Sequence, residues 1–220
     1  GFMISGPTLA ESVAAAIRAG ILDGKYLSGE RLIELNLAKT MGVSQITVRD
    51  ALRILEQEGW VTKNPRRGVY VRSFTPEAAE EVYALLRTFE GLAMEWVLNK
   101  YTRQMGADLH NFVDAARKHA QKDERRDAID KLFDFHDYLA RVIEKPLSNQ
   151  ILDMLSNQTR MLEAIRQVRA PMNAQSLNAN IELHDQLLEA IEKGELATTR
   201  QLVNTVFETY SELMISVLKV

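Results

Sequence analysis

The sequence predicts a mainly α-helical protein in two parts: three short helices with a two-stranded hairpin, followed by a bundle of six or seven helices. Apolar residues recur at helical spacing along most of the 220 residues, and β-like runs occur only at 60–62 and 69–71. Thr75-Pro76-Glu77 then combines a helix N-cap, a proline in the first turn and an early acid. We therefore expect a first domain at residues 1–74 and a second at residues 75–220.

The composition is that of a globular protein, with 46% hydrophobic and 26% charged residues. No window holds 18 uninterrupted apolar residues, so we expect no transmembrane helix and no membrane partner. The first six residues are too short and uncharged for a signal peptide. The chain has no cysteine, which excludes disulfides and thiol catalysis. These features favour a cytoplasmic protein.

The charge is divided unevenly along the chain. Residues 1–75 hold 10 Lys and Arg against 7 Asp and Glu, whereas the remainder holds 17 against 23, so +3 and −6 give the net −3. A mildly basic segment joined to an acidic body suits a small module that binds a polyanion.

Start and stop signals define the three N-terminal helices. Thr8 opens a capping box for a helix that Gly24 ends. A second short helix is expected at 32–40. Ser44 caps a third helix, which Gly59 ends. This order, with a hairpin after the third helix, predicts a winged helix-turn-helix.

The third helix would carry the contacts to DNA. Its apolar residues fall on one face, which leaves polar side chains outward: Gln45, Thr47, Arg49 and Arg53. Gln reads adenine edges, Thr contacts a thymine methyl or a phosphate, and Arg suits guanine or phosphate. Arg66 and Arg67, at the hairpin tip, could reach the backbone or the minor groove. Periodicity alone leaves open a plain helical subdomain with a surface hairpin.

Residues 9–72 resemble the winged helix-turn-helix of the GntR family. The resemblance is carried, with the spacing kept, by residues 21–24, 28–32, 37–38, 41–44, 48–52, 55, 58–59 and 67–69. The helical remainder is similar to the FadR-type effector domain called FCD. The resemblance implies a homodimeric transcriptional regulator that binds a pseudo-palindromic operator. It also implies that a small organic acid or related metabolite alters DNA affinity, and it adds Arg31, Ser44 and Gly68 to the DNA-binding residues.

The chain departs from the family at the start of the recognition helix. The common pattern there is Ser-Arg-Thr-Pro-Val-Arg-Glu-Ala-Leu. Gln45 replaces the first arginine and Thr47 the proline, whereas Arg49 is retained. We therefore expect Arg49 to be the main DNA contact and the operator to differ from the common one.

Two histidines are expected to point into the second domain. His136 and His184 each lie on an apolar stripe at helical spacing. They are either neutral core imidazoles or part of an effector pocket. The resemblance implies one Asp and three His around a divalent metal, but Leu132 and Asn204 stand at two of those positions. His136 and His184 would then be the remnant of a metal site, and a bound metal is disfavoured.

The remaining pocket residues come from the resemblance. Arg87, three residues before Glu90, is either half of a surface ion pair or an anchor for an anionic effector such as a carboxylate. Asn180, one turn before His184, could line the same cavity. The expected effector-binding residues are therefore Arg87, His136, Asn180, His184 and Asn204.

Three alternatives remain beside this interpretation. A metal-independent sensor of a bulkier ligand, such as an acyl-CoA, would share the same fold. A helical metal-dependent hydrolase could use His136 and His184, but the chain lacks a nucleophile motif and a complete metal shell, so we do not expect an enzyme. The third is a structural DNA-binding protein without an effector, against which the large acidic helical domain with inward polar residues argues.

Overall fold

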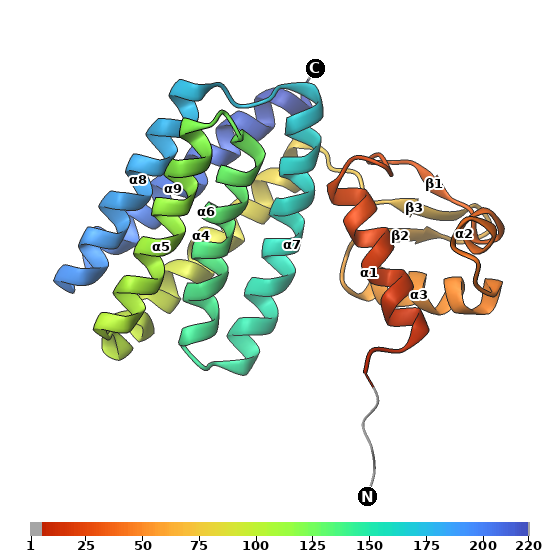
Figure 1. Ribbon diagram of the computed structural model, residues 1–220, viewed down its shortest axis with the longest axis horizontal. Helices are drawn as coiled ribbons and strands as arrows, with labels where there is room; N and C mark the ends of the chain where they lie inside the picture. Colours follow the sequence, from red (N-terminus) through yellow and green to blue (C-terminus); the bar gives the residue numbers. More distant parts are fainter. Residues whose placement is uncertain (1–5, 220) are drawn as a thin grey trace, which may run out of the picture. The chain divides into compact units, whose positions relative to one another are not determined.

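The computed structural model describes residues 6–219, which divide into two compact units (Figure 1). The first unit extends to Phe74 and includes residues 160–168. The second contains residues 75–159 and the chain from Arg169 onward.

Three helices and three strands make up the N-terminal part of the first unit. They are α1 (Leu9–Leu22), β1 (Arg31–Leu32), α2 (Glu34–Met41), α3 (Gln45–Gln57), β2 (Val61–Asn64) and β3 (Gly68–Val71). The capping box predicted for α1 is confirmed. Thr8 Oγ1 accepts from the Glu11 amide at 3.1 Å, and the Glu11 carboxylate accepts from the Thr8 amide at 3.0 Å.

The sheet has one more strand than the sequence predicts. Its order is β1-β3-β2, and both pairs are antiparallel. The extra strand, β1, is only two residues long, so no alternation of apolar and polar residues reveals it. Leu32 is buried by its pairing with Val69 in β3, where the sequence suggests the start of a helix.

Six helices follow within the described residues, and they make up the second unit except for residues 160–168, which belong to the first. The helices are α4 (Pro76–Lys100), α5 (Arg103–Gln121), α6 (Arg125–Val142), α7 (Pro146–Arg169), α8 (Ala174–Lys193) and α9 (Leu196–Leu218). Gly106, which looks like a break before a helix, lies inside α5, whose cap is Thr102. A Cβ at Gly106 would lie 2.3 Å from the Tyr101 hydroxyl, so glycine is needed there for close packing.

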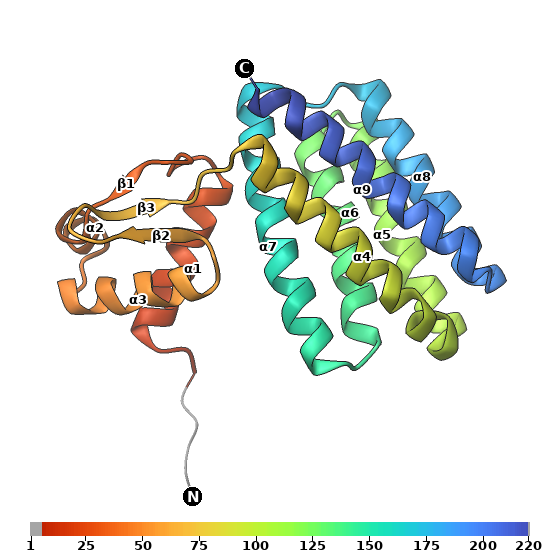
Figure 2. The same cartoon turned by 180° about the vertical axis from the view of Figure 1, so that it is seen from behind.

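Packing in the second unit brings its first and last helices together. Helix α4 runs alongside α9, and α5 packs against both α6 and α8, as two opposite views show (Figures 1 and 2). Large apolar side chains of α6 form the centre of the core, with Phe135, Leu139 and Leu132 almost fully buried. His136 therefore lies among buried neighbours from helices distant in sequence.

Candidate functional site

A tight turn joins α2 to α3 and orients α3. Gly42, at the end of α2, has a left-handed φ of 66°, which favours glycine. Ser44 then caps α3, because its Oγ accepts a hydrogen bond from the Thr47 amide at 3.1 Å. Buried residues fix the inner face: Val48, Ala51, Leu52 and Leu55. The other face of α3 is left exposed to a partner.

A carboxylate from α2 holds two exposed side chains of α3. The Arg49 guanidinium donates to both oxygens of Glu34 at 3.0 to 3.3 Å, and the Gln45 amide donates to the same group at 3.3 Å. The hydrogen bond from Arg49 lowers the pKa of Glu34, which keeps the carboxylate ionised. Arg49 is thus oriented while its side chain stays 49% exposed. The sequence analysis missed Glu34, because no helical period links residues 15 positions apart on different helices.

The other predicted cations of this unit are exposed. Arg53 pairs with Asp50 one turn earlier on α3, at 3.3 Å. Arg66 and Arg67 lie in the turn between β2 and β3, where Arg66 has a positive φ of 65°. The hairpin therefore presents two guanidinium groups next to each other in sequence.

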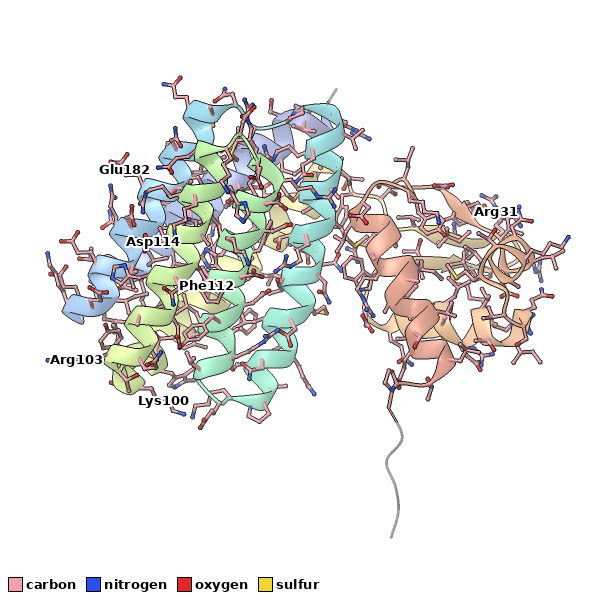
Figure 3. The ribbon with its side chains drawn as sticks, in the orientation of Figure 1. Arg31, Lys100, Arg103, Phe112, Asp114 and Glu182 are labelled. Carbon is pink, nitrogen blue, oxygen red and sulfur yellow. The ribbon has the colours of Figure 1, made fainter. Side chains whose placement is uncertain are left out.

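Gly68 has a specific steric role beside Arg31. Its φ is 120°, and a Cβ there would lie 2.9 Å from the Arg31 side-chain Nε. Arg31, on the edge strand β1 (Figure 3), therefore packs across the start of β3 because position 68 has no side chain. The predicted residues of the first unit thus fall on α3, on its cap and on the three-stranded wing.

The second unit encloses a small cavity of about 30 Å³. Its walls come from α4, α6, α7 and α9, and its polar lining includes Glu90, His136, Asp137, Ser156, Thr159 and Tyr210. A cavity that binds a molecule as small as benzene has a volume of about 150 Å³, several times larger. A metabolite can therefore enter only if a wall moves.

A chain of hydrogen bonds runs from the cavity wall across the bundle. Glu90 Oε1 lies 2.5 Å from His136 Nδ1, and His136 Nε2 lies 2.8 Å from His184 Nε2. His184 Nδ1 lies 2.8 Å from the carbonyl oxygen of Asn180. Burial, reinforced by the charge of His136, lowers the pKa of His184 to about 3. His184 is therefore neutral near pH 7.

This neutral state fixes the direction of each bond. A carbonyl only accepts, so His184 carries its proton on Nδ1, and its Nε2 accepts from His136. A further proton must lie between His136 Nδ1 and Glu90, which makes that pair neutral overall. The second Glu90 oxygen, Oε2, is buried without a hydrogen-bond partner among residues 6–219. It is an acceptor that a ligand could use.

Two residues expected in the pocket lie elsewhere. Arg87 pairs with Glu208 at 3.4 Å, with 37% of its side chain exposed, and it does not line the cavity. Asn204 is exposed, whereas Phe207 faces His136 with ring centroids 5.1 Å apart. The register assigned to the last helix from the sequence is therefore offset by almost one turn.

Asn180 contributes through two different groups. Its backbone carbonyl accepts from His184, as described above, and its side-chain amide donates to the hydroxyl of Tyr210. The structure therefore brings three of the five expected pocket residues together: His136, Asn180 and His184. Glu90 and Tyr210, which the sequence analysis did not place there, complete the cluster.

The cluster does not supply the ligands that a divalent metal needs. Leu132 lines the cavity where the resemblance implies a carboxylate, and Glu90 occupies one nitrogen of His136. The two remaining Nε2 atoms bond to each other, whereas zinc takes about four ligands. Within residues 6–219, the His, Asp and Glu side chains that do bring three ligand atoms together are His119, Glu124 and Asp127, near the start of α6.

Comparison with known families decides the identity of both units. Residues 9–71 match the family model of bacterial regulatory proteins, gntR family, and residues 81–209 match the FCD domain. The protein belongs to the GntR family. The gntR-family match lies in the first unit of this GntR-family protein, and the FCD match lies mainly in the second. The family and the matched relatives are transcriptional regulators and not enzymes, which argues against the hydrolase alternative.

Curated relatives of this GntR-family chain are also regulators. It is 36% identical over 80 residues to the uncharacterized HTH-type transcriptional regulator YdhC of Bacillus subtilis, and 40% identical over 73 residues to GgaR of Escherichia coli K12. These matches span 36% and 33% of this chain, but only 36% and 28% of the relatives' own lengths. A probable D-xylose utilization operon transcriptional repressor of Paenarthrobacter nicotinovorans is 23% identical over 86% of this chain and 80% of its own length.

Solved structures share the whole fold at low sequence identity. Escherichia coli McbR/YncC aligns with a TM-score of 0.82 and 19% identity, over 96% of this chain and 98% of its own. A putative transcriptional regulator GntR from Rhodococcus sp. RHA1 aligns with a TM-score of 0.77 and 22% identity, over 94% and 97%. These likenesses confirm the predicted fold class. Across residues 6–219, no helix is both long and apolar enough to cross a membrane.

Proposed function

We propose that this regulator binds a pseudo-palindromic operator as a cytoplasmic homodimer. The observation that carries the proposal is the exposed face of α3, on which Glu34 orients Arg49 and Gln45. One recognition helix per subunit reads one half-site, and a two-fold symmetric protein pairs with an inverted repeat.

Each predicted contact has a chemical role in this proposal. Arg49 pairs with guanine or a phosphate, Gln45 reads adenine, and Thr47 meets a thymine methyl or a phosphate. The hairpin arginines reach the backbone or the adjacent minor groove. The other members of the set hold the backbone of the duplex near α3 and the wing: Arg31, Ser44, Arg53 and Gly68.

Selection from random duplexes tests the DNA-binding proposal. The purified protein should enrich an inverted repeat, and fluorescence anisotropy should then measure its affinity for one and for two half-sites. Analytical ultracentrifugation should give a dimer. A monomer at micromolar concentration that binds one asymmetric half-site tightly would contradict the proposal.

We further propose that the FCD unit binds a small metabolite at the cavity and that binding changes operator affinity. The unpartnered oxygen of Glu90 and the polar cluster around it support a ligand there. The relative named as a repressor of a D-xylose operon supports a response to a metabolite. A bulky acyl-CoA fits poorly, and an organic acid lacks a cationic anchor because Arg87 pairs with Glu208. Mass spectrometry of small molecules carried by the purified protein tests this proposal.

We infer that the regulator works without a resident divalent metal. Since Phe207 and not Asn204 faces His136, the double variant Leu132→Asp with Phe207→His should gain zinc. The matched control, Leu132→Asp with Asn204→His, should gain much less. Metal analysis after zinc addition and dialysis provides the measurement. Near-stoichiometric metal at His136 and His184 of the parent would contradict the inference.

A further inference from the structure

A second, larger space lies on the surface of the FCD unit, beside α8 and α9. This groove has a volume of about 490 Å³, in the range of small-molecule sites. Apolar Leu183 and Leu213 lie among hydrogen-bonding side chains, which include Ser176, Asn180, Gln186, Thr209 and Ser216. The groove has room for a metabolite, whereas the enclosed cavity does not.

One side chain borders both spaces. Tyr210 lines the enclosed cavity and also the groove. Its hydroxyl accepts from the Asn180 amide, and its ring stacks on Tyr83 at 6.5 Å between centroids. Because the carbonyl of Asn180 also accepts from His184, the contact that holds Tyr210 is directly joined to the buried histidine pair.

Apart from the Glu90–His136 pair, which is neutral overall, the charged side chains that line this path are acidic. Asp137 lines the cavity, while Glu182 and Glu212 line the groove, with Glu182 on the outer surface of α8 (Figure 3). No Lys or Arg contributes to the lining of either space within the part of the chain that the structure describes. An anionic ligand would lose water beside like charges without gaining a cationic partner.

A ligand that carries hydrogen-bond donors would instead find an acceptor without a partner. The Oε2 atom of Glu90, a residue only 3% exposed, needs a donor that the described chain does not provide. A hydroxyl or amino group that reached the cavity would supply it. The same groups would bond to the hydroxyl and amide side chains of the groove on the way.

We propose that the groove is the entrance to the cavity, that Tyr210 is its gate, and that the effector carries hydroxyl or amino donors and no anionic group. Rotation of the Tyr210 ring joins the two spaces and breaks its bond to Asn180. The ligand then donates to Glu90 Oε2. The inference rests on the proposed effector role of the FCD unit.

Thiol labelling tests the gate without knowledge of the natural effector. The chain has no cysteine, so one introduced thiol reports access to one place. Ser156→Cys puts the thiol in the cavity wall, and Ser216→Cys puts a matched thiol in the groove. The probes are three methanethiosulfonates of similar size: neutral hydroxyethyl, cationic aminoethyl and anionic sulfonatoethyl. Each rate is divided by the rate for the same variant in urea.

The charge of the reagent should decide entry to the cavity. We expect the thiol of Ser156→Cys to react about tenfold or more faster with the neutral and cationic reagents than with the anionic one. Thiol ionisation affects all three reagents equally, so their ratio isolates access. Equal rates for the anionic and neutral reagents would overturn the proposed effector class.

Opening the gate should raise the labelling rate of the cavity thiol but not that of the groove thiol. Two second substitutions are each added to Ser156→Cys: Asn180→Ala, or Tyr210→Phe, which removes only the hydroxyl. Each should raise the rate of cavity labelling about three- to tenfold, as expected for the loss of one hydrogen bond. Ser216→Cys should be unaffected, which also shows that the variants fold. Unchanged cavity rates, or a thiol that no reagent reaches in any background, would overturn the gate. Labelling needs no DNA, so its failure is separate from failure of the operator assays.

Discussion

The helix-turn-helix unit and the FCD unit hold their functional groups in opposite ways. On the first unit, Ser44 and Thr47 are three residues apart, and Arg49 keeps half of its side chain in solvent. In the second, Glu90 and His184 reach His136 from positions 46 and 48 residues away, and His184 is fully buried.

This difference sets how each unit responds to change. An exposed ion pair contributes only about 0–1 kcal/mol, so the DNA-contact surface can vary by small steps. A buried polar group left without a partner costs about 1–3 kcal/mol, so the proposed effector site tolerates few partial changes. Variants should therefore have graded effects on DNA binding and larger effects on the stability of the bundle.

The largest expected effect is a loss of bundle stability in acid. The pKa of His184 is about 3 in the folded protein and 6.5 in an unfolded chain, so the unfolded state binds more protons between these values. The stabilisation is complete above pH 6.5 and falls as the pH is lowered, by roughly 1.4 kcal/mol per pH unit from this group. His184→Gln should flatten this dependence.

The two tryptophans allow each unit to be followed separately. Trp60 lies in the first unit and Trp96 on α4 of the second. Urea unfolding of a Trp60→Phe variant at pH 7, 6 and 5 therefore reports the bundle, and a Trp96→Phe variant reports the other unit. If the bundle keeps the same acid sensitivity after His184→Gln, the buried imidazole is not its source.

The same contrast explains what the sequence could predict. Caps and periodicity act over a few residues, so Thr8, Ser44 and Thr75 correctly locate helix starts. The two-residue strand β1 is too short to carry a pattern. Nothing local reveals that Gly106 packs against the Tyr101 hydroxyl inside a helix.

The proposed effector site was harder to predict from the sequence. Apolar stripes correctly turned His136 and His184 inward, since helical period fixes a face. They could not show that Glu90, on a different helix, faces His136, or that Arg87 turns toward Glu208. The register of the last helix could not be fixed from the sequence, because a shift of three residues, from Asn204 to Phe207, changes which side chain enters the core.

The second prediction concerns Arg49, the proposed main DNA contact. Arg49→Ala should weaken operator binding by about 1–3 kcal/mol if the guanidinium makes a bidentate base contact. Fluorescence anisotropy against the selected operator gives the measurement, with Arg103→Ala on α5 as a control of equal charge change. Unchanged affinity in a folded Arg49→Ala protein would remove this residue from the DNA-contact set.

The third prediction separates the wing from the recognition helix. Replacing Arg66 and Arg67 by Ala should weaken binding to operator and random duplexes alike, because phosphate contacts carry no sequence information. The slope of log affinity against log salt should flatten by up to about 2, one for each lost phosphate contact. A loss confined to the operator would instead mean that these arginines read bases in the minor groove.

The smallest effect is expected at Glu34, where exposed charges are coupled. Glu34→Gln keeps a side-chain oxygen that Arg49 can donate to, but it removes the charge that orients the guanidinium. We expect the affinity ratio of operator to random DNA to fall by about two- to fivefold, because an exposed pair contributes under about 1 kcal/mol. Binding to random DNA should rise slightly, since one negative charge is lost near the phosphates. Glu56→Gln, at the other end of α3, makes the same net charge change and should leave the ratio unaltered. If the two variants lose specificity equally, net charge and not the orientation of Arg49 determines the affinity ratio. Local contacts on α3 would then be less important than the contrast between the two units implies.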